Sequence, residues 1–181
     1  MASTSTMKTN LVLYGFMGAG KTTVASTIAK SHGLTLRDTD EIVEAQEGAT
    51  IEEIFRAMGE IYFRSIERDV VRMLSQRDGQ VIATGGGVPL DASNVTALAD
   101  RGVGIYLRAT PVTLSHRLQG AKNRPLLGKG TSAKKIQSLL ATRREFYGRV
   151  THVIDTDRLE LGQVCQKAWQ LFLDSGGAAS R

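Results

Sequence analysis

Short apolar runs alternate along the chain with longer stretches that have helical periodicity. Runs of a few apolar residues are typical of buried strands, whereas apolar residues spaced three or four apart are typical of amphipathic helices. The expected strands are residues 10–14, 34–38, 80–84, 103–107 and 151–155. Each is separated from the next by enough chain for the crossover helix that parallel strands require. The pattern therefore predicts an α/β fold, with a parallel sheet covered by helices on both faces.

Local signals place the helices between these strands. Thr50 and Glu53 form a capping-box pattern that opens a short helix, and Gly59 ends it. Thr110 and Pro111 fit an N-cap followed by proline at the first helical position. Apolar periodicity predicts the remaining helices at residues 23–32, 60–77, 132–147 and 160–173. We expect one domain over residues 10–173, with disordered ends at 1–9 and 174–181.

Length, charge and cysteine content limit the classes of function. The 181 residues are enough for one domain with a buried core. A net charge of +5 suggests an anionic partner, but the basic residues are scattered, so small phosphates and carboxylates fit as well as nucleic acid does. No aromatic-and-basic motif or bilayer-length apolar run is present, so we expect neither a nucleic-acid nor a membrane partner. The single cysteine, Cys165, and a start without a secretion signal favour a cytoplasmic protein, which we expect to be a monomer.

The stretch from Gly15 to Thr22 fits the pattern G-x-x-x-x-G-K-[ST], which wraps the phosphates of a nucleotide. It follows an expected strand and precedes an expected helix, the context that this motif requires. Its glycines let backbone N–H groups approach the phosphates closely. Lys21 is expected to reach the β- and γ-phosphates, and the Thr22 hydroxyl to bind Mg²⁺. The loop predicts an ATP site but does not identify the phosphoryl acceptor.

Two aspartates follow the second expected strand, in Asp38-Thr39-Asp40. Ligands of open parallel sheets bind beyond the carboxyl ends of the strands, so these carboxylates and the glycine loop share one edge. Phosphoryl transfer requires a metal anchor and an aligned nucleophile. One aspartate could hold Mg²⁺ through water while the other takes a proton from the acceptor hydroxyl. The alternative is that Asp40 only caps the following helix.

The third expected strand ends in Ala83-Thr84, without an acidic residue, and is followed by Gly85-Gly86-Gly87. The missing acidic residue counts against a mechanical ATPase. Three successive glycines leave backbone that a ligand can approach closely, although a flexible turn is the alternative.

Several arginines could bind carboxylate or phosphate. Arg64 has Glu67 one helical turn away, and Arg143 and Arg144 lie on a later cationic helix. Arg124 lies between Gly120 and Gly130 in a stretch without helical period, which suggests a mobile lid that brings this arginine onto the phosphates. The histidines share no metal-ligand spacing.

Together these residues resemble the shikimate kinases. The matching motifs, in family order and spacing over about residues 10–158, are Gly15–Thr22, Asp38-Thr39-Asp40, Ile54-Phe55, Gly59-Glu60, Phe63-Arg64, Gly85-Gly86-Gly87 and Arg124-Pro125-Leu126-Leu127. The resemblance implies a P-loop, nucleoside-monophosphate-kinase-like three-layer sandwich with a five-stranded parallel sheet in the order 2-3-1-4-5. It implies transfer of the ATP γ-phosphoryl group to the 3-hydroxyl of shikimate, in the pathway to chorismate and the aromatic amino acids.

The resemblance also implies roles for individual residues. Asp40, Lys21 and Arg124 are the implied catalytic residues, and Thr22 and Asp38 the implied Mg²⁺ residues. The implied ATP-binding residues are Gly18, Ala19, Gly20, Lys21, Thr22, Thr23, Arg117, Arg124 and Arg158, with Arg117 stacking on adenine. The implied shikimate-binding residues are Asp40, Phe55, Phe63, Arg64, Gly85, Gly86, Gly87 and Arg143. The shikimate-binding region covers about residues 39–67, and the lid about residues 119–131.

Two rival functions remain open at this point. A kinase of the same architecture could act on gluconate or a nucleoside monophosphate. A non-catalytic nucleotide-binding protein is the rival from another class, although such a protein is expected to have lost Lys21, Asp40 or Arg124, and all three are present.

Overall fold

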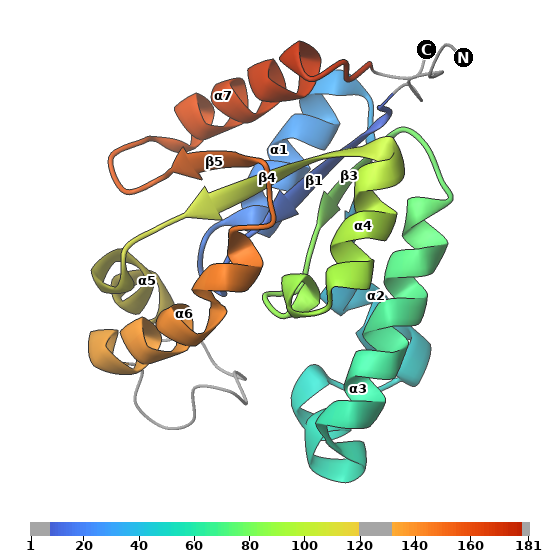
Figure 1. Ribbon diagram of the computed structural model, residues 1–181, viewed down its shortest axis with the longest axis vertical. Helices are drawn as coiled ribbons and strands as arrows, with labels where there is room; N and C mark the ends of the chain where they lie inside the picture. Colours follow the sequence, from blue (N-terminus) through green and yellow to red (C-terminus); the bar gives the residue numbers. More distant parts are fainter. Residues whose placement is uncertain (1–7, 120–131, 179–181) are drawn as a thin grey trace.

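The computed structural model describes residues 8–119 and 132–178, which form a five-stranded parallel sheet (Figure 1). The strands are β1 (Asn10–Tyr14), β2 (Thr35–Asp38), β3 (Gln80–Ala83), β4 (Gly102–Arg108) and β5 (His152–Asp155). Their order is β2-β3-β1-β4-β5, as the family resemblance implied. β1 is central and pairs with β3 on one side and β4 on the other. The predicted strands are all present, with ends shifted by one residue at most.

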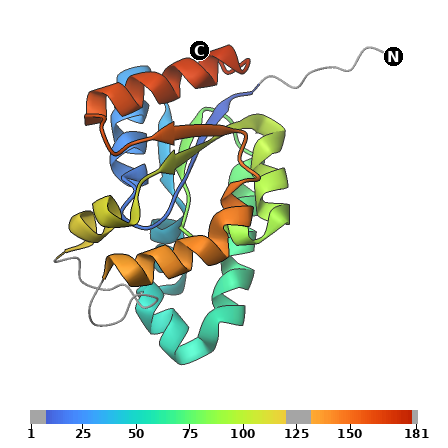
Figure 2. The same cartoon turned by 60° about the vertical axis from the view of Figure 1, so that its left-hand side comes forward.

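Helices cover both faces of this sheet. They are α1 (Lys21–His32), α2 (Thr39–Glu47), α3 (Ile51–Ser75), the 3₁₀ turn η1 (Val88–Leu90), α4 (Ala92–Arg101), α5 (Pro111–Leu118), α6 (Ala133–Tyr147) and α7 (Leu161–Asp174). Alternate residues of β1 face the two cores: Leu11 and Leu13 join the core under α1 and α7, whereas Val12 and Tyr14 join the core under α3 and α4. The result is the expected three-layer α/β sandwich (Figures 1 and 2).

The helix that begins at Ile51 differs from its prediction. Its capping box is present, with Thr50 and Glu53 bonded reciprocally. Gly59 does leave the helical conformation, at φ 81° and ψ 174°, but helix resumes at once and continues to Ser75. Gly59 is therefore an elbow inside α3, and not the end of a short separate helix.

The expected disordered ends were placed too wide. Lys8 forms a parallel bridge with Gly177, and the Ala178 N–H donates to the Lys8 carbonyl over 2.9 Å. Thr9 donates its N–H to the Arg101 carbonyl over 2.9 Å. Backbone pairing fixes these residues, and a glycine- and serine-rich composition does not reveal such pairing. No helix within the described ranges has the length and apolar character needed to cross a membrane.

Three segments that carry candidate chemistry follow strand ends in this fold. The glycine loop follows β1, α2 begins directly after β2, and the Gly85–Gly87 turn follows β3. Because β1, β2 and β3 are parallel neighbours, their carboxyl ends lie at one edge of the sheet. α6 comes to the same region by packing against α5 and η1 (Figure 2).

Candidate active site

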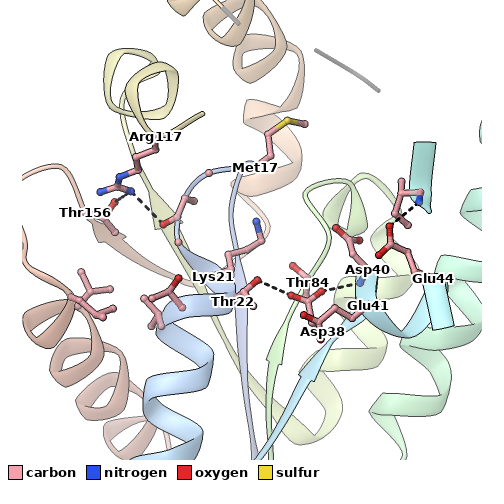
Figure 3. Close-up of a pocket in the computed structure, with 18 of the residues that line it drawn as sticks. Met17, Lys21, Thr22, Asp38, Asp40, Glu41, Glu44, Thr84, Arg117 and Thr156 are labelled. Atoms are coloured by element: carbon pink, nitrogen blue, oxygen red, sulfur yellow. Dashed lines mark hydrogen bonds between the residues drawn. The ribbon is translucent and has the colours of Figure 1, made fainter. Parts of the chain in front are cut away.

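An open cavity of about 840 Å³ lies at this edge of the sheet. The loop from Met17 to Thr23 forms one wall, Asp38 and Asp40 form part of a second, and Arg117 and Thr156 lie at the other end. Figure 3 shows Lys21, Asp40 and Arg117 projecting into this space from three different elements. The predicted phosphate loop and the aspartate pair are therefore brought together.

The glycine loop has the backbone that its sequence predicts. Gly18 and Gly20 have φ angles of 79° and 91°, a region that other residues rarely adopt. Gly20 is the N-cap of α1 and provides no side-chain cap, so the helix presents its first N–H groups to the cavity. Lys21 Nζ donates to the carbonyl oxygens of Gly15 and Phe16 over 2.9 and 3.0 Å. Uncapped helix N–H groups beside an ammonium group suit a phosphate.

Thr22 and Asp38 form one connected unit next to this loop. The Thr22 hydroxyl donates to Asp38 Oδ2 over 2.7 Å, and Asp38 Oδ1 accepts the Asp40 N–H over 3.0 Å. Asp38 is thus the N-cap of α2, so the alternative that Asp40 serves only as this cap is wrong. The described part of the chain has no cluster of three or more acidic, histidine or cysteine ligands. A hydroxyl and a carboxylate fit Mg²⁺ in the manner usual for nucleotide sites, where phosphates and water supply most ligands.

Asp40 lies against the glycine turn that follows β3. A methyl group on Gly85 would overlap Asp40 Oδ1 and would come within 3.3 Å of Glu67 Oε1. The buried Thr39 hydroxyl accepts the Gly85 N–H over 2.7 Å, which joins the start of α2 to this turn. The absence of a side chain at Gly85 therefore lets the Asp40 carboxylate occupy its position, whereas the sequence suggested close approach by a ligand.

Arg64 is held beside the same turn. Its Nη1 donates to Glu67 Oε2 over 2.8 Å, and its Nη2 to Glu60 Oε1 over 3.1 Å. A methyl group on Gly87 would overlap the guanidinium. Glu67 is only 2% exposed, and burial raises the pKa of its carboxyl group, while the Arg64 charge opposes that rise. Glu67 therefore orients Arg64, as the spacing predicted.

Arg143 approaches the turn from α6. It is 7% exposed, its Nη1 lies 3.4 Å from the Gly86 carbonyl oxygen, and its Cζ lies 5.7 Å from the Phe16 ring centroid. Among the described residues, no carboxylate forms an ion pair with it. The neighbouring Arg144 is exposed, so the structure separates two arginines that only the family resemblance had distinguished.

The two phenylalanines lie beside Arg64. Like Arg64, Arg143 and the Gly85–Gly87 turn, they are not among the residues that line the 840 Å³ cavity, which Asp40 alone of the predicted shikimate-binding residues lines. The rings of Phe55 and Phe63 are tilted against each other with their centroids 4.6 Å apart. Phe63 is buried, and Arg64 Cζ lies 5.1 Å from its ring centroid. They support the acceptor side through the core that they share with Ile54.

The residues predicted to contact the nucleotide base differ in where the structure places them. Arg117 Nη1 lies 3.5 Å from both the Ala19 carbonyl oxygen and the Thr156 hydroxyl, so Arg117 does border the cavity. Arg158 is exposed and lies on a separate surface hollow with Asp157 and Lys167, so the structure does not bring it to this cavity. Arg124 and residues 120–131 of the expected lid lie outside the described residues.

Sequence reasoning missed further residues at this site, and three of them are instructive. Thr156 directly follows β5, so the rule that ligands bind beyond strand ends could have identified it. Leu159 lines the cavity from the next loop, and no sequence signal marks it. The hydroxyl of Tyr147, the last residue of α6, donates to the Gly86 carbonyl over 2.8 Å, a contact that its apolar spacing does not suggest.

Known proteins confirm the family that the motifs resemble. The family model for shikimate kinase matches residues 17–172. The shikimate kinase of Symbiobacterium thermophilum is 42% identical over 92% of this chain and 98% of its own length. That of Caldanaerobacter subterraneus subsp. tengcongensis is 38% identical over 93% of this chain and 98% of its own length.

Solved structures agree with these relatives. The shikimate kinase of Acinetobacter baumannii in complex with shikimate superposes with a TM-score of 0.87 at 37% identity, covering 93% of this chain and 94% of that chain. A gluconokinase of Sinorhizobium meliloti has a TM-score of 0.57 at 17% identity, which shows a shared fold and no more. The protein described here belongs to the shikimate kinase family.

Proposed function

We propose that the protein transfers the γ-phosphoryl group of ATP to the 3-hydroxyl of shikimate, giving shikimate 3-phosphate and ADP on the route to chorismate and the aromatic amino acids. The buried Arg143 guanidinium is the observation that carries the choice of acceptor. It has no carboxylate partner among the described residues, and it lies at the same glycine turn as Arg64 and Asp40. A buried unpaired charge is costly, so the site favours an anionic acceptor that also presents hydroxyl groups.

The phosphate donor occupies the glycine-loop side of the cavity in this proposal. The loop residues Gly18, Ala19 and Gly20, the first helical residues Thr22 and Thr23, and the Lys21 ammonium hold the phosphates. Thr22 and Asp38 would hold Mg²⁺, which supplies charge neutralisation for the phosphates when bound. Arg117 packs against adenine, and Arg124 covers the phosphates.

The acceptor occupies the side formed by the Gly85–Gly87 turn, α2, α3 and α6. Arg64 and Arg143 grip the shikimate carboxylate, and Phe55 and Phe63 support its ring. Asp40 orients the 3-hydroxyl and accepts its proton. Catalysis is then mainly positioning of the hydroxyl and electrostatic stabilisation of the transferring group.

Measurement of ADP formation tests this proposal directly. Purified protein with ATP and Mg²⁺ is assayed with shikimate, gluconate or a nucleoside monophosphate, and we expect ADP release to depend on shikimate. Asp40→Asn is expected to lower turnover by about 10²–10⁴-fold, because proton transfer and alignment are lost, while ATP affinity stays nearly unchanged. Asp69→Asn, an exposed carboxylate on α3, is the matched control and should retain turnover.

Other outcomes would change the proposal. ADP release that depends on gluconate or a nucleoside monophosphate would reassign the acceptor. Substantial activity of Asp40→Asn would remove Asp40 from the proton-accepting role. We further propose a cytoplasmic monomer that binds neither nucleic acid nor membrane, and size-exclusion chromatography with light scattering measures its oligomeric state.

A further inference from the structure

The carbonyl oxygen of Gly86 receives two side-chain donors from α6. The Tyr147 hydroxyl donates over 2.8 Å, an ordinary distance for a strong hydrogen bond. Arg143 Nη1 lies 3.4 Å away, at the long end of the hydrogen-bonding range. Tyr147 therefore supplies the good bond, and Arg143 makes only a weak one.

α6 fixes both side chains on the same side. Arg143 and Tyr147 are four residues apart, so they lie on one face of the helix, and they are 7% and 3% exposed. The Tyr147 ring stacks on Tyr106 of β4, with centroids 4.6 Å apart and planes inclined by 4°. Burial raises the pKa of Tyr147, and the nearby Arg143 charge opposes the rise, so the hydroxyl keeps its proton and acts as a donor at physiological pH.

We propose that Tyr147 is a positioning residue that occupies the Gly86 carbonyl so that the Arg143 guanidinium stays available to the carboxylate of the acceptor. This inference rests on the proposed function and extends it to a residue that does not itself touch the acceptor. Gly86 is half-buried, and a carbonyl that is largely shielded from water costs free energy when it lacks a good partner. Without the Tyr147 hydroxyl, Arg143 is the donor that remains to satisfy Gly86, and it turns toward the carbonyl and away from its ligand.

Hydrogen bonds from other elements also hold the glycine turn, so the turn cannot easily move to find the Gly86 carbonyl a new partner. The Gly85 N–H donates to Thr39, and the Gly85 and Gly87 carbonyls accept from Val88 and Leu90 over 3.1 and 2.9 Å. A methyl group on Gly86 would lie 3.4 Å from the Met17 nitrogen, so the turn also packs against the phosphate loop. The backbone of the turn therefore has little freedom to move. When the Tyr147 hydroxyl is removed, it is the Arg143 side chain that changes position.

Tyr147→Phe tests the proposal because it removes the hydroxyl and keeps the stacked ring. We expect the KM for shikimate to rise about tenfold, the size of one net hydrogen bond, with kcat and the KM for ATP changed less than about twofold. Tyr106→Phe is the matched control. Its ring is the stacking partner, and its hydroxyl makes no hydrogen bond within the described ranges, so it should leave all three constants unchanged.

A second acceptor distinguishes positioning of Arg143 from general damage. With the primary carboxamide of shikimate, which lacks the negative charge, wild type and Tyr147→Phe should have similar KM values. Both acceptors are measured on the same sample, so a partial loss of folded protein affects both measurements equally and does not change the comparison between them. Adding Tyr147→Phe to Arg143→Ala should likewise raise the KM for shikimate no further, because the group that Tyr147 positions is already gone.

Several results would overturn the inference. An unchanged KM for shikimate in Tyr147→Phe, an equal loss with both acceptors, or full additivity with Arg143→Ala would each leave Tyr147 a structural role only. These results are distinct from failure of the proposed function, which would appear as no shikimate-dependent ADP release by the wild type. That result would remove the inference together with the function.

Discussion

At the scale of single residues, the groups proposed to bind the acceptor meet at the buried Glu67 carboxylate. Its Oε2 accepts from Arg64, whereas its Oε1 has no hydrogen-bond partner among the described residues and faces Gly85. Asp40, Arg64 and Arg143 all influence its pKa, so it lies among the groups proposed to bind the acceptor. Glu67 orients Arg64, but its own burial disfavours the charged form of its carboxyl group.

This burial predicts how stability depends on pH. The pKa of Glu67 is raised above its ordinary value of 4.5, chiefly by burial, so the folded state binds this proton more tightly than the unfolded state does. The contribution to stability is therefore fully present below the unfolded pKa and is lost as pH rises through the folded pKa. We expect the free energy of unfolding of wild type, minus that of Glu67→Gln, to fall as the pH rises above the ordinary carboxyl pKa of 4.5.

Urea unfolding of both proteins over this pH range measures the difference. Each unit of separation between the folded and unfolded pKa values contributes about 1.4 kcal/mol. A difference that grows with pH would show that the Arg64 charge outweighs burial and that the pKa of Glu67 is lowered.

At the scale of elements, α3 contributes Phe55, Phe63 and Arg64 to the proposed acceptor side, on two halves that meet at Gly59. Phe55 lies on the first half, whereas Arg64 and Glu67 lie on the second. Hydrogen bonds tie α2 to both halves: Glu44 accepts from the Ile51 N–H over 2.9 Å, and Glu47 from the Tyr62 hydroxyl over 3.0 Å. The elbow therefore sets where α2 and the first half of α3 stand relative to Arg64.

Gly59→Ala is expected to destabilise the protein through backbone strain alone. A methyl group at Gly59 would meet nothing within 4 Å, but φ 81° with ψ 174° is a conformation almost confined to glycine. We expect the free energy of unfolding to fall by about 1–3 kcal/mol, measured by urea denaturation.

Gly162→Ala in the first turn of α7 is the matched control. This glycine also has open space but no positive φ, so alanine should be neutral or stabilising because of its higher helix propensity. Equal stability of Gly59→Ala and wild type would show that the elbow straightens without cost.

At the scale of the whole molecule, the sequence predicts the donor side better than the acceptor side. The glycine loop is contiguous and lies between a strand and a helix, so its geometry follows from local pattern. The alternation of elements predicts a parallel sheet, but the strand order was known only through the family resemblance, because local patterns do not state on which side of a strand a crossover returns.

The acceptor side depends on contacts between distant segments, which a single sequence does not reveal. Local pattern does not distinguish Arg143 from Arg144, and the family resemblance alone selected Arg143, which the packing of α6 buries while Arg144 stays exposed. Tyr147 has the spacing of a core residue, and its hydrogen bond to Gly86 spans 61 positions. Arg158 lies on the exposed loop after β5, and the structure places it outside the cavity, which its position in the sequence does not reveal.

The two sides of the cavity should respond separately to ligands. A ligand that binds only the folded state stabilises it by about 2.7 kcal/mol at 100 times its Kd, which for a chain of this size raises the Tm by about 5–10 °C. We expect Arg64→Ala and Arg143→Ala to lose most of the rise caused by shikimate while keeping the rise caused by ADP with Mg²⁺, and Lys21→Ala to do the reverse. Thermal denaturation with each ligand measures this, and Arg144→Ala, the exposed neighbour on α6, should keep both responses. If Arg143→Ala and Arg144→Ala lose the shikimate response equally, general positive charge on α6 binds the acceptor, and the assignment of Arg143 to the shikimate carboxylate is wrong.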